Sequence, residues 1–118
     1  MTTNQIATRL VELCRQGQID TALEELFAEN AVSIEANEMM GPKVVIGIEG
    51  IKAKSIAFQA GVEAFHGATI SDPIVGGNSF AITWTMDATF KGRGRMTIEE
   101  VCVYQVNDGK ITLEQFFY

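Results

Sequence analysis

One carboxylic acid interrupts an otherwise apolar face of a predicted strand. Across residues 96–106 the even positions are Met, Ile, Glu, Cys, Tyr and Val, so Glu100 stands between Ile98 and Cys102. Alternate strand residues share one face, and an ionised carboxylate without a partner is costly on an apolar face. Glu100 must therefore have a partner, be protonated or face a wet cavity. The alternative is a twist or bulge that turns Glu100 to solvent, as expected for its neighbour Glu99.

The strand that carries Glu100 is the middle one of a predicted antiparallel meander. Two turn signals, at residues 91–95 and 107–109, separate three alternating runs rich in β-branched and aromatic residues. If the first turn closes on Phe90 and Met96, Met86 lies opposite Glu100. The inner face of the first run is then formed by its even positions: Phe80, Ile82, Trp84, Met86, Ala88 and Phe90.

The second turn decides which side chains of the last strand face Glu100. A two-residue loop at Asp108-Gly109 puts the odd positions there: Ile111, Leu113, Gln115 and Phe117. A three-residue loop at residues 107–109, with a bulge, puts the even positions there: Thr112, Glu114, Phe116 and Tyr118. We favour the three-residue loop, because it needs a positive φ only at Gly109.

The remaining elements must position this sheet. Apolar spacing predicts helices over residues 3–17, 20–27 and 51–65, a strand over 31–37, a short extended piece over 39–46 and a broken strand over 66–76. In the third helix the buried face is predicted to hold Ile51, Ser55, Phe58, Val62 and Phe65, with Lys52, Lys54, Gln59 and Glu63 off it. Segregated helices and antiparallel strands indicate an α+β fold of one domain, residues 1–118.

The predicted sheet is apolar on both sides. Val101 and Val103 alternate with the inner positions of their strand and are joined on the outer face by apolar side chains of the last strand. Such a sheet needs two covers. The helices provide one, and we expect a second copy of the chain to provide the other, which predicts a homodimer.

Composition excludes several partners. The formal net charge is −6 and the pI is about 4.7, whereas nucleic acids and anionic membranes attract basic surfaces. Cys14 and Cys102 form no metal-ligand spacing with His66, so we expect buried thiols and no metal. No signal peptide or membrane span is evident. We therefore expect a cytoplasmic protein without a nucleic-acid or membrane partner.

Three segments carry a family resemblance: residues 26–32 leading into Glu35, residues 47–51 and residues 103–113. With them, nearly the whole chain resembles the SnoaL-like members of the nuclear transport factor two superfamily. The resemblance implies a curved, mostly antiparallel sheet wrapped around N-terminal helices to form a cone with an apolar pocket. Relatives of this kind include ketosteroid isomerases, polyketide cyclases, epoxide hydrolases and dehydratases, as well as pocketed proteins without assigned activity.

The resemblance also suggests roles for two glutamates. Glu35 falls where the isomerases have their general base, and Glu100 falls near the protonated acid that donates a hydrogen bond to the oxyanion. The match is incomplete, because the first helix lacks the isomerase tyrosine and Phe116 stands where the epoxide hydrolases have an aspartate. The only histidine, His66, is predicted to be a surface or capping residue. An exposed position for Glu35 also remains open.

Two functions follow as alternatives. The first is a pocket that binds a small apolar ligand without catalysis. The second is a cofactor-free acid/base isomerase, cyclase or dehydratase acting on a small apolar carbonyl compound, with Glu35 as base and Glu100 as hydrogen-bond donor. In both, the predicted ligand-binding residues are Phe58, Val62, Trp84, Met86, Phe90, Cys102, Tyr104, Glu114, Phe116 and Tyr118.

Overall fold

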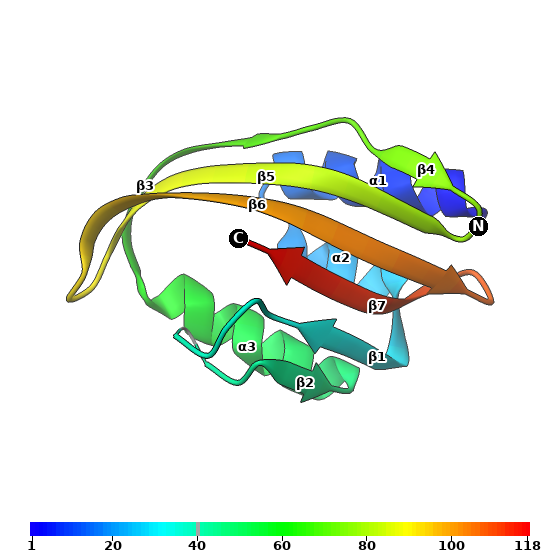
Figure 1. Ribbon diagram of the computed structural model, residues 1–118, viewed down its shortest axis with the longest axis horizontal. Coiled ribbons are helices and arrows are strands. Elements are labelled where there is room, and N and C mark those ends of the chain that lie inside the picture. Colours follow the sequence, from blue (N-terminus) through cyan, green and yellow to red (C-terminus); the bar gives the residue numbers. More distant parts are fainter. Residues whose placement is uncertain (40) are drawn as a thin grey trace.

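The chain starts with two helices that pack against one side of a curved sheet (Figure 1). The computed structural model describes residues 1–39 and 41–118. Helix α1 spans Thr3–Arg15 and begins with a capping box, in which the Thr2 hydroxyl accepts from the Gln5 backbone and the Gln5 side chain accepts from the Thr2 backbone. Helix α2 spans Ile19–Leu26. Its N-cap is Gln18, so the helix begins one residue before the predicted start at residue 20.

One seven-stranded sheet contains all the strands. They are β1 (Phe27–Ile34), β2 (Val44–Ile46), β3 (Val62–Ile70), β4 (Ile74–Gly76), β5 (Ser79–Phe90), β6 (Gly94–Asn107) and β7 (Lys110–Phe117). The order is β2-β1-β7-β6-β5-β3, with β4 also paired to β5. Only β1 and β7 run parallel among the described pairs. The predicted α+β class and mostly antiparallel sheet are confirmed, although the extended piece expected over 39–46 is a strand only from Val44, and Met40 lies outside the described residues.

The register of the β5–β6 hairpin differs from the expected one by two residues. Phe90 pairs with Gly94 instead of Met96, so Glu100 lies opposite Trp84 rather than Met86. The turn is therefore tighter than predicted and uses positive φ at Gly92 and Gly94. Because side chains alternate with a period of two, the two-residue shift leaves Glu100 on the same face of the sheet.

The β6–β7 turn has the expected partners but not the expected loop. Asn107 pairs with Lys110, which makes Asp108-Gly109 a two-residue turn. Both turn residues have positive φ, 51° and 74°, as a type I′ turn requires. The register then shifts between Gln105 and Val106, where Thr112 is the extra residue of β7. Because of this bulge, the even positions of β7 lie on the same face as Glu100, as the favoured three-residue loop predicted, and Tyr104 pairs with Glu114.

The third helix is shorter than predicted. Helix α3 spans Ile48–Ala60, and β3 begins at Val62, so residues 62–65 belong to the sheet and not to the helix. Gly61 ends the helix. Its amide donates to the Ala57 and Phe58 carbonyl groups. The prediction that Lys54 lies off the packed face is also wrong, because Lys54 is half-buried and bonded to β1.

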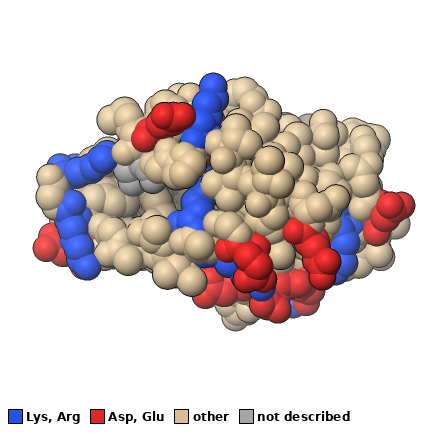
Figure 2. All heavy atoms as spheres, turned by 90° about the horizontal axis from the view of Figure 1, so that it is seen from below, with Lys and Arg blue, Asp and Glu red and all other residues tan. Residues whose placement is uncertain are grey.

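The basic side chains at the β5–β6 turn are solvated. Lys91, Arg93 and Arg95 are exposed. Figure 2 shows basic side chains at the end of the molecule that this hairpin forms. Arg95 forms an ion pair with Asp87 across the two strands, at 2.8 Å. Among the described residues, none of the helices has both the length and the apolar character needed to span a bilayer.

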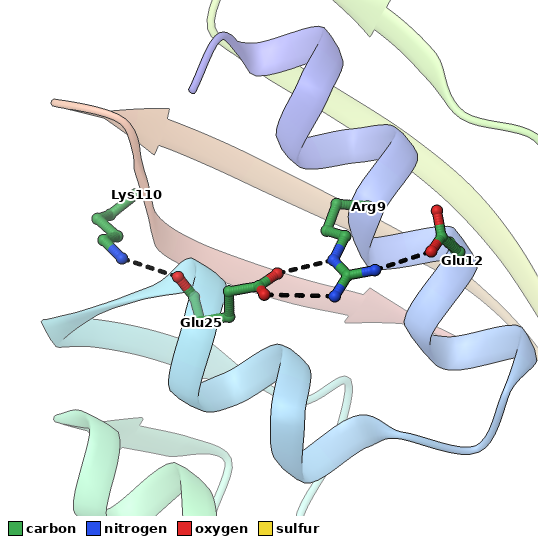
Figure 3. Close-up of polar contacts among 4 residues, drawn as sticks. All are labelled: Arg9, Glu12, Glu25 and Lys110. Atoms are coloured by element: carbon green, nitrogen blue, oxygen red, sulfur yellow. Dashed lines mark hydrogen bonds and ion pairs between the residues drawn. The ribbon is translucent and has the colours of Figure 1, made fainter.

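The core lies between the sheet and helices α1 and α2. It includes Ile6, Leu10, Leu23, Leu26, Ile82 and Ile111, and the predicted buried thiols Cys14 and Cys102. On the surface, Arg9 ties α1 to α2, because its guanidinium donates to both carboxylate oxygens of Glu25 and also to Glu12 (Figure 3). Lys110 of β7 donates to the Glu25 backbone carbonyl at 2.7 Å. These contacts fix α1 to α2, and α2 to the start of β7.

Candidate functional site

Glu100 lies on the helix-facing side of β6 in a largely apolar setting. Its cross-strand partner is Trp84, and the thiol of Cys102 donates to its Oε1 at 3.6 Å. Burial, together with the negative charge of Glu35, raises the pKa of Glu100 to about 7, against a lowering by the Cys102 hydrogen bond. Near neutral pH, Glu100 is therefore a carboxyl group that can both give and take a proton.

Glu35 follows directly after β1 and is held by two side chains. The ammonium of Lys54 lies 2.7 Å from its Oε1, and the Tyr118 hydroxyl donates to its Oε2 at 3.1 Å. The Glu35 amide donates to the Lys43 carbonyl, which fixes the backbone where β1 ends. The Glu35 side chain is 18 % exposed. It is therefore a paired carboxylate at the edge of the buried network and not an exposed strand residue.

A hydrogen-bonded chain continues from Lys54 into the interior. Lys54 Nζ donates to Ser33 Oγ at 2.7 Å, and Ser33 Oγ donates to Glu114 Oε1 at 2.7 Å. Ser33 and Glu114 are paired across the parallel β1–β7 ladder and are both buried. Burial raises the pKa of Glu114 to about 7, although the Ser33 hydrogen bond and the Lys54 charge lower it.

The three carboxyl groups act on one another electrostatically. The charge of Glu35 raises the pKa of both Glu100 and Glu114, whereas Lys54 lowers both values. Strand register explains this grouping, since Tyr104 of β6 pairs with Glu114 of β7, which pairs with Ser33 of β1. The structure thus places the two predicted catalytic residues, Glu35 and Glu100, within electrostatic range of each other and of Lys54, although Glu100 has its hydrogen bond to Cys102 and not to Lys54.

The predicted ligand-binding residues fall into two groups. Trp84, Met86, Phe58, Val62 and Phe116 are half-buried on the side of the sheet that carries Glu100. Phe58 packs edge-to-face on Phe90, with ring centroids 5.8 Å apart. In contrast, Phe90, Cys102 and Tyr104 are buried, and Tyr104 stacks on Phe80 in the core. Tyr118 is the most exposed of the set, at 49 %.

Sequence reasoning missed Lys54 and Ser33. Both left a signal, because Lys54 stands three residues after the buried Ile51, and residues three apart share a helix face. Ser33 has the parity of the buried Ala31 in β1. A polar residue at a buried position requires a partner, and Ser33 has two.

Two surface hollows lie elsewhere. One of about 470 Å³ lies between α1 and the segment after β3, lined in part by Arg15 and Asp72. Another of about 290 Å³ lies at the start of α3, beside Ile46 and Glu49. We place the candidate site at the carboxyl network, because proton transfer needs titratable groups with shifted pKa values and neither hollow is lined by them.

A curved sheet packed on N-terminal helices, with carboxyl groups on its inner face, defines a cone-shaped α+β domain of the nuclear transport factor two type. The sequence profile of the SnoaL-like domain matches residues 1–118. The chain therefore belongs to the SnoaL-like family. No protein with a curated description matches it.

Solved structures agree with this assignment. A protein from Mesorhizobium loti, proposed to be a SnoaL-like polyketide cyclase, is 40 % identical with a TM-score of 0.93, covering 100 % of both chains. A protein of ketosteroid isomerase-like fold from Catenulispora acidiphila, in complex with trimethylamine, is 19 % identical with a TM-score of 0.74, covering 96 % of this chain and 84 % of its own. TerC, co-crystallised with polyporic acid, is 17 % identical with a TM-score of 0.75, covering 99 % and 92 %.

Proposed function

We propose that this protein binds a small, largely apolar carbonyl compound and catalyses its enolisation without a cofactor. The observation that carries the proposal is the presence of two differently held carboxyl groups that act on each other electrostatically. Glu35 is paired with Lys54, whereas Glu100 has a pKa raised to about 7 by burial. Acid/base chemistry at neutral pH needs such a pair, one group to take a proton and one to supply a hydrogen bond.

The proposed step moves one proton and leaves the electron count unchanged. Glu35 takes a proton from the carbon next to the carbonyl, and the electron pair of that C–H bond forms a C=C bond. The carbonyl π electrons move to the oxygen, which accepts a hydrogen bond from protonated Glu100. Return of the proton to a different carbon gives isomerisation, and attack of the enolate carbon on a second carbonyl group gives cyclisation.

The names of the relatives support a small-molecule substrate. The protein at 40 % identity is proposed to be a polyketide cyclase, and TerC was crystallised with polyporic acid. Half-buried apolar side chains near Glu100, including Trp84 and Met86, supply a surface for an apolar body.

Hydrogen–deuterium exchange tests the proposal without knowledge of the natural substrate. A panel of small cyclic ketones, enones and β-diketones is incubated with the protein in deuterated buffer, and exchange at the carbon next to the carbonyl is followed by NMR. We expect the wild type to accelerate exchange for part of the panel, and Glu35→Gln to slow it by roughly 100-fold or more.

Matched controls separate chemistry from folding. Glu99→Gln alters the exposed neighbour of Glu100, and Glu38→Gln alters an exposed glutamate close to Glu35. Both should exchange substrate like the wild type, while Glu100→Gln should be impaired. Exchange by the wild type no faster than buffer across the panel would contradict enolisation.

Ligand binding without chemistry is the second candidate. The observation that favours it is the full pairing of Glu35, whose two carboxylate oxygens are engaged by Lys54 and Tyr118. Both oxygens that could accept a proton from a substrate are therefore already in contact with side chains of the protein. Binding of the same compounds, seen by Trp84 fluorescence without deuterium exchange, would support this function over the first.

We also propose a homodimer formed through the outer face of the sheet. Strand register groups apolar side chains on that face: Val32, Ile34, Val44, Ile46, Val101, Val103, Leu113 and Phe117. Ile46 is 75 % exposed, and the cross-strand pair Val101 and Phe117 is 42 % and 49 % exposed. The same register places Gln115 between Val103 and Ile34. Clustered exposed apolar side chains are typical of a protein–protein interface.

A further inference from the structure

We propose that Lys54 is a further catalytic residue, which binds the oxygen anion that forms on the substrate during enolisation. This inference rests on the proposed function and adds the positively charged ammonium of Lys54 to the proposed enolisation site. Lys54 comes from α3, whereas the carboxyl groups come from the strands and the end of β1. Among the described residues, it is the only cation that makes a hydrogen bond or ion pair with this network.

The hydrogen bonds of Lys54 leave one donor available. An ammonium group has three N–H donors. Nζ donates one of them to Ser33 Oγ and forms an ion pair with Glu35 Oε1, each at 2.7 Å. No third oxygen partner is recorded among the described residues, and Nζ lies 5.1 Å from the centre of the Phe116 ring. The third N–H is therefore free to meet a ligand oxygen, and its side chain is 23 % exposed.

The chain through Ser33 fixes the ammonium in place. Ser33 Oγ accepts a hydrogen bond from Lys54 and donates one to Glu114, so the Ser33 hydroxyl proton points toward Glu114 and its lone pairs face Lys54. The aromatic face of Phe116 is within the range of a cation–π contact. With these contacts and the Glu35 ion pair, Lys54 is oriented before any substrate arrives, as electrostatic catalysis requires.

Charge conservation gives this position its catalytic value. When Glu35 takes a proton, it loses the negative charge that pairs with Lys54, and the same charge appears on the substrate oxygen. An ammonium within reach of both atoms stabilises the charge before and after the transfer. Proton transfer to Glu35 breaks the Lys54–Glu35 ion pair. A charge-assisted hydrogen bond from Lys54 to the enolate oxygen replaces it and offsets that loss.

The chemistry of this site also restricts the substrate class. The anion must be an oxygen bonded to an sp² carbon, next to a C–H bond that Glu35 can reach, as in a neutral ketone, enone or β-diketone. A substrate that already carries a carboxylate would compete for Lys54 and would approach three carboxyl groups. We therefore infer neutral enolisable carbonyl compounds.

Phenolate binding tests Lys54 without any turnover. A phenolate carries its negative oxygen on an sp² carbon, as an enolate does, and a nitrophenol reports its ionisation by absorbance. We expect the wild type to bind the phenolate form, and Lys54→Met to weaken phenolate binding by roughly 10- to 100-fold. Binding of the neutral phenol at low pH should change much less.

Two further variants keep the test decisive. Lys52→Met changes a lysine two residues away that pairs with Glu24 outside the network, and it should bind like the wild type. Lys54→Arg retains a cation and should recover part of the phenolate binding. An equal loss of phenol and phenolate binding in Lys54→Met, or no preference for phenolate in the wild type, would overturn the inference.

Failure of this inference is distinguishable from failure of the proposed function. If Lys54→Met exchanges deuterium at the wild-type rate while Glu35→Gln does not, enolisation stands and Lys54 has no catalytic part. If the wild type catalyses no exchange but binds phenolate through Lys54, the oxyanion site stands and the proposed enolisation does not.

Discussion

At the scale of single residues, the site depends on carboxyl groups that the fold makes hard to ionise. Burial raises the pKa of Glu100 and Glu114 from an ordinary value of 4.5 to about 7. Glu35 and Lys54 face both groups with opposite effects on these pKa values. Between pH 4.5 and 7 the folded protein therefore holds protons that the unfolded chain has released.

This gives a pH dependence of stability opposite to that of a salt-bridged carboxylate. The contribution of Glu100 and Glu114 to the free energy of unfolding is greatest below about pH 4.5, falls as the pH rises to about 7 and is constant above. Each group accounts for at most about 3 kcal/mol. Urea unfolding at pH 5 and pH 8 should show a smaller decrease for Glu100→Gln than for the wild type, and an unchanged decrease for Glu99→Gln.

Ser33 offers a second residue-scale prediction. Ser33→Ala removes the donor to Glu114 and one acceptor of Lys54, and leaves Glu114 ionisable but unsupported. We expect a loss of about 1–3 kcal/mol at pH 8, and a smaller loss at pH 5, where Glu114 is protonated. A loss that is the same at both pH values would show that the hydroxyl does not support the Glu114 charge.

At the scale of elements, the position of α3 determines whether Lys54 reaches β1. Gly50 lets α3 approach β2, because a Cβ atom at this position would lie 2.8 Å from Val45 Cγ1. Valine is stiff about its first side-chain torsion, so the helix would have to move. The contact between α3 and β2 thus sets the distance from Lys54 to Glu35.

Gly50→Ala should therefore destabilise the protein despite the better helix propensity of alanine. Overpacking costs about 1–3 kcal/mol, and the gain in propensity is about 1 kcal/mol, which predicts a net loss of about 1 kcal/mol by urea unfolding. Gly76→Ala, where a Cβ meets nothing within 4 Å, is the control and should lose much less. Phenolate binding should weaken in Gly50→Ala as Lys54 is displaced.

The sequence predicts some of these elements better than others, for physical reasons. Alternation along residues 80–90 and 96–106 determines which face Glu100 occupies, and that result survives the two-residue error in register because parity is unchanged. The two-residue turn at Asp108-Gly109 is one of two alternatives and is not the favoured one, because it needs a positive φ at an aspartate and a bulge at Thr112 that the sequence does not mark. Lys54 was misplaced because the spacing of apolar residues does not show that Glu35 and Ser33 lie where they can bind its ammonium group.

At the scale of the whole molecule, the exposed apolar side chains on the outer face of the sheet support the proposed homodimer. Val101 and Phe117 lie side by side on that face, on neighbouring strands. Burial of these two side chains in a dimer would stabilise the dimer by about 25 cal/mol for each Å² of apolar surface removed from water.

Val101→Glu should therefore shift the protein to the monomer. A carboxylate at the centre of an apolar interface carries a desolvation cost of several kcal/mol, so sedimentation velocity at micromolar concentration should show a dimer for the wild type and a monomer for the variant. Ile74→Glu changes a side chain that is 78 % exposed on β4 and should remain dimeric. A monomeric wild type would contradict the homodimer.

The parallel pairing of β1 with β7 has a consequence for the order of folding. Ser33 and Glu114 are 81 residues apart in the chain, and Glu35 and Tyr118 are 83 apart. Contacts of such long range form late, because the loop-closure entropy must be overcome before they contribute. The helices and the β5–β6 hairpin can form from local contacts. The Ser33–Glu114 and Glu35–Tyr118 hydrogen bonds form only after β7 docks beside β1. Recovery of ligand binding during refolding should therefore lag behind the recovery of helical signal.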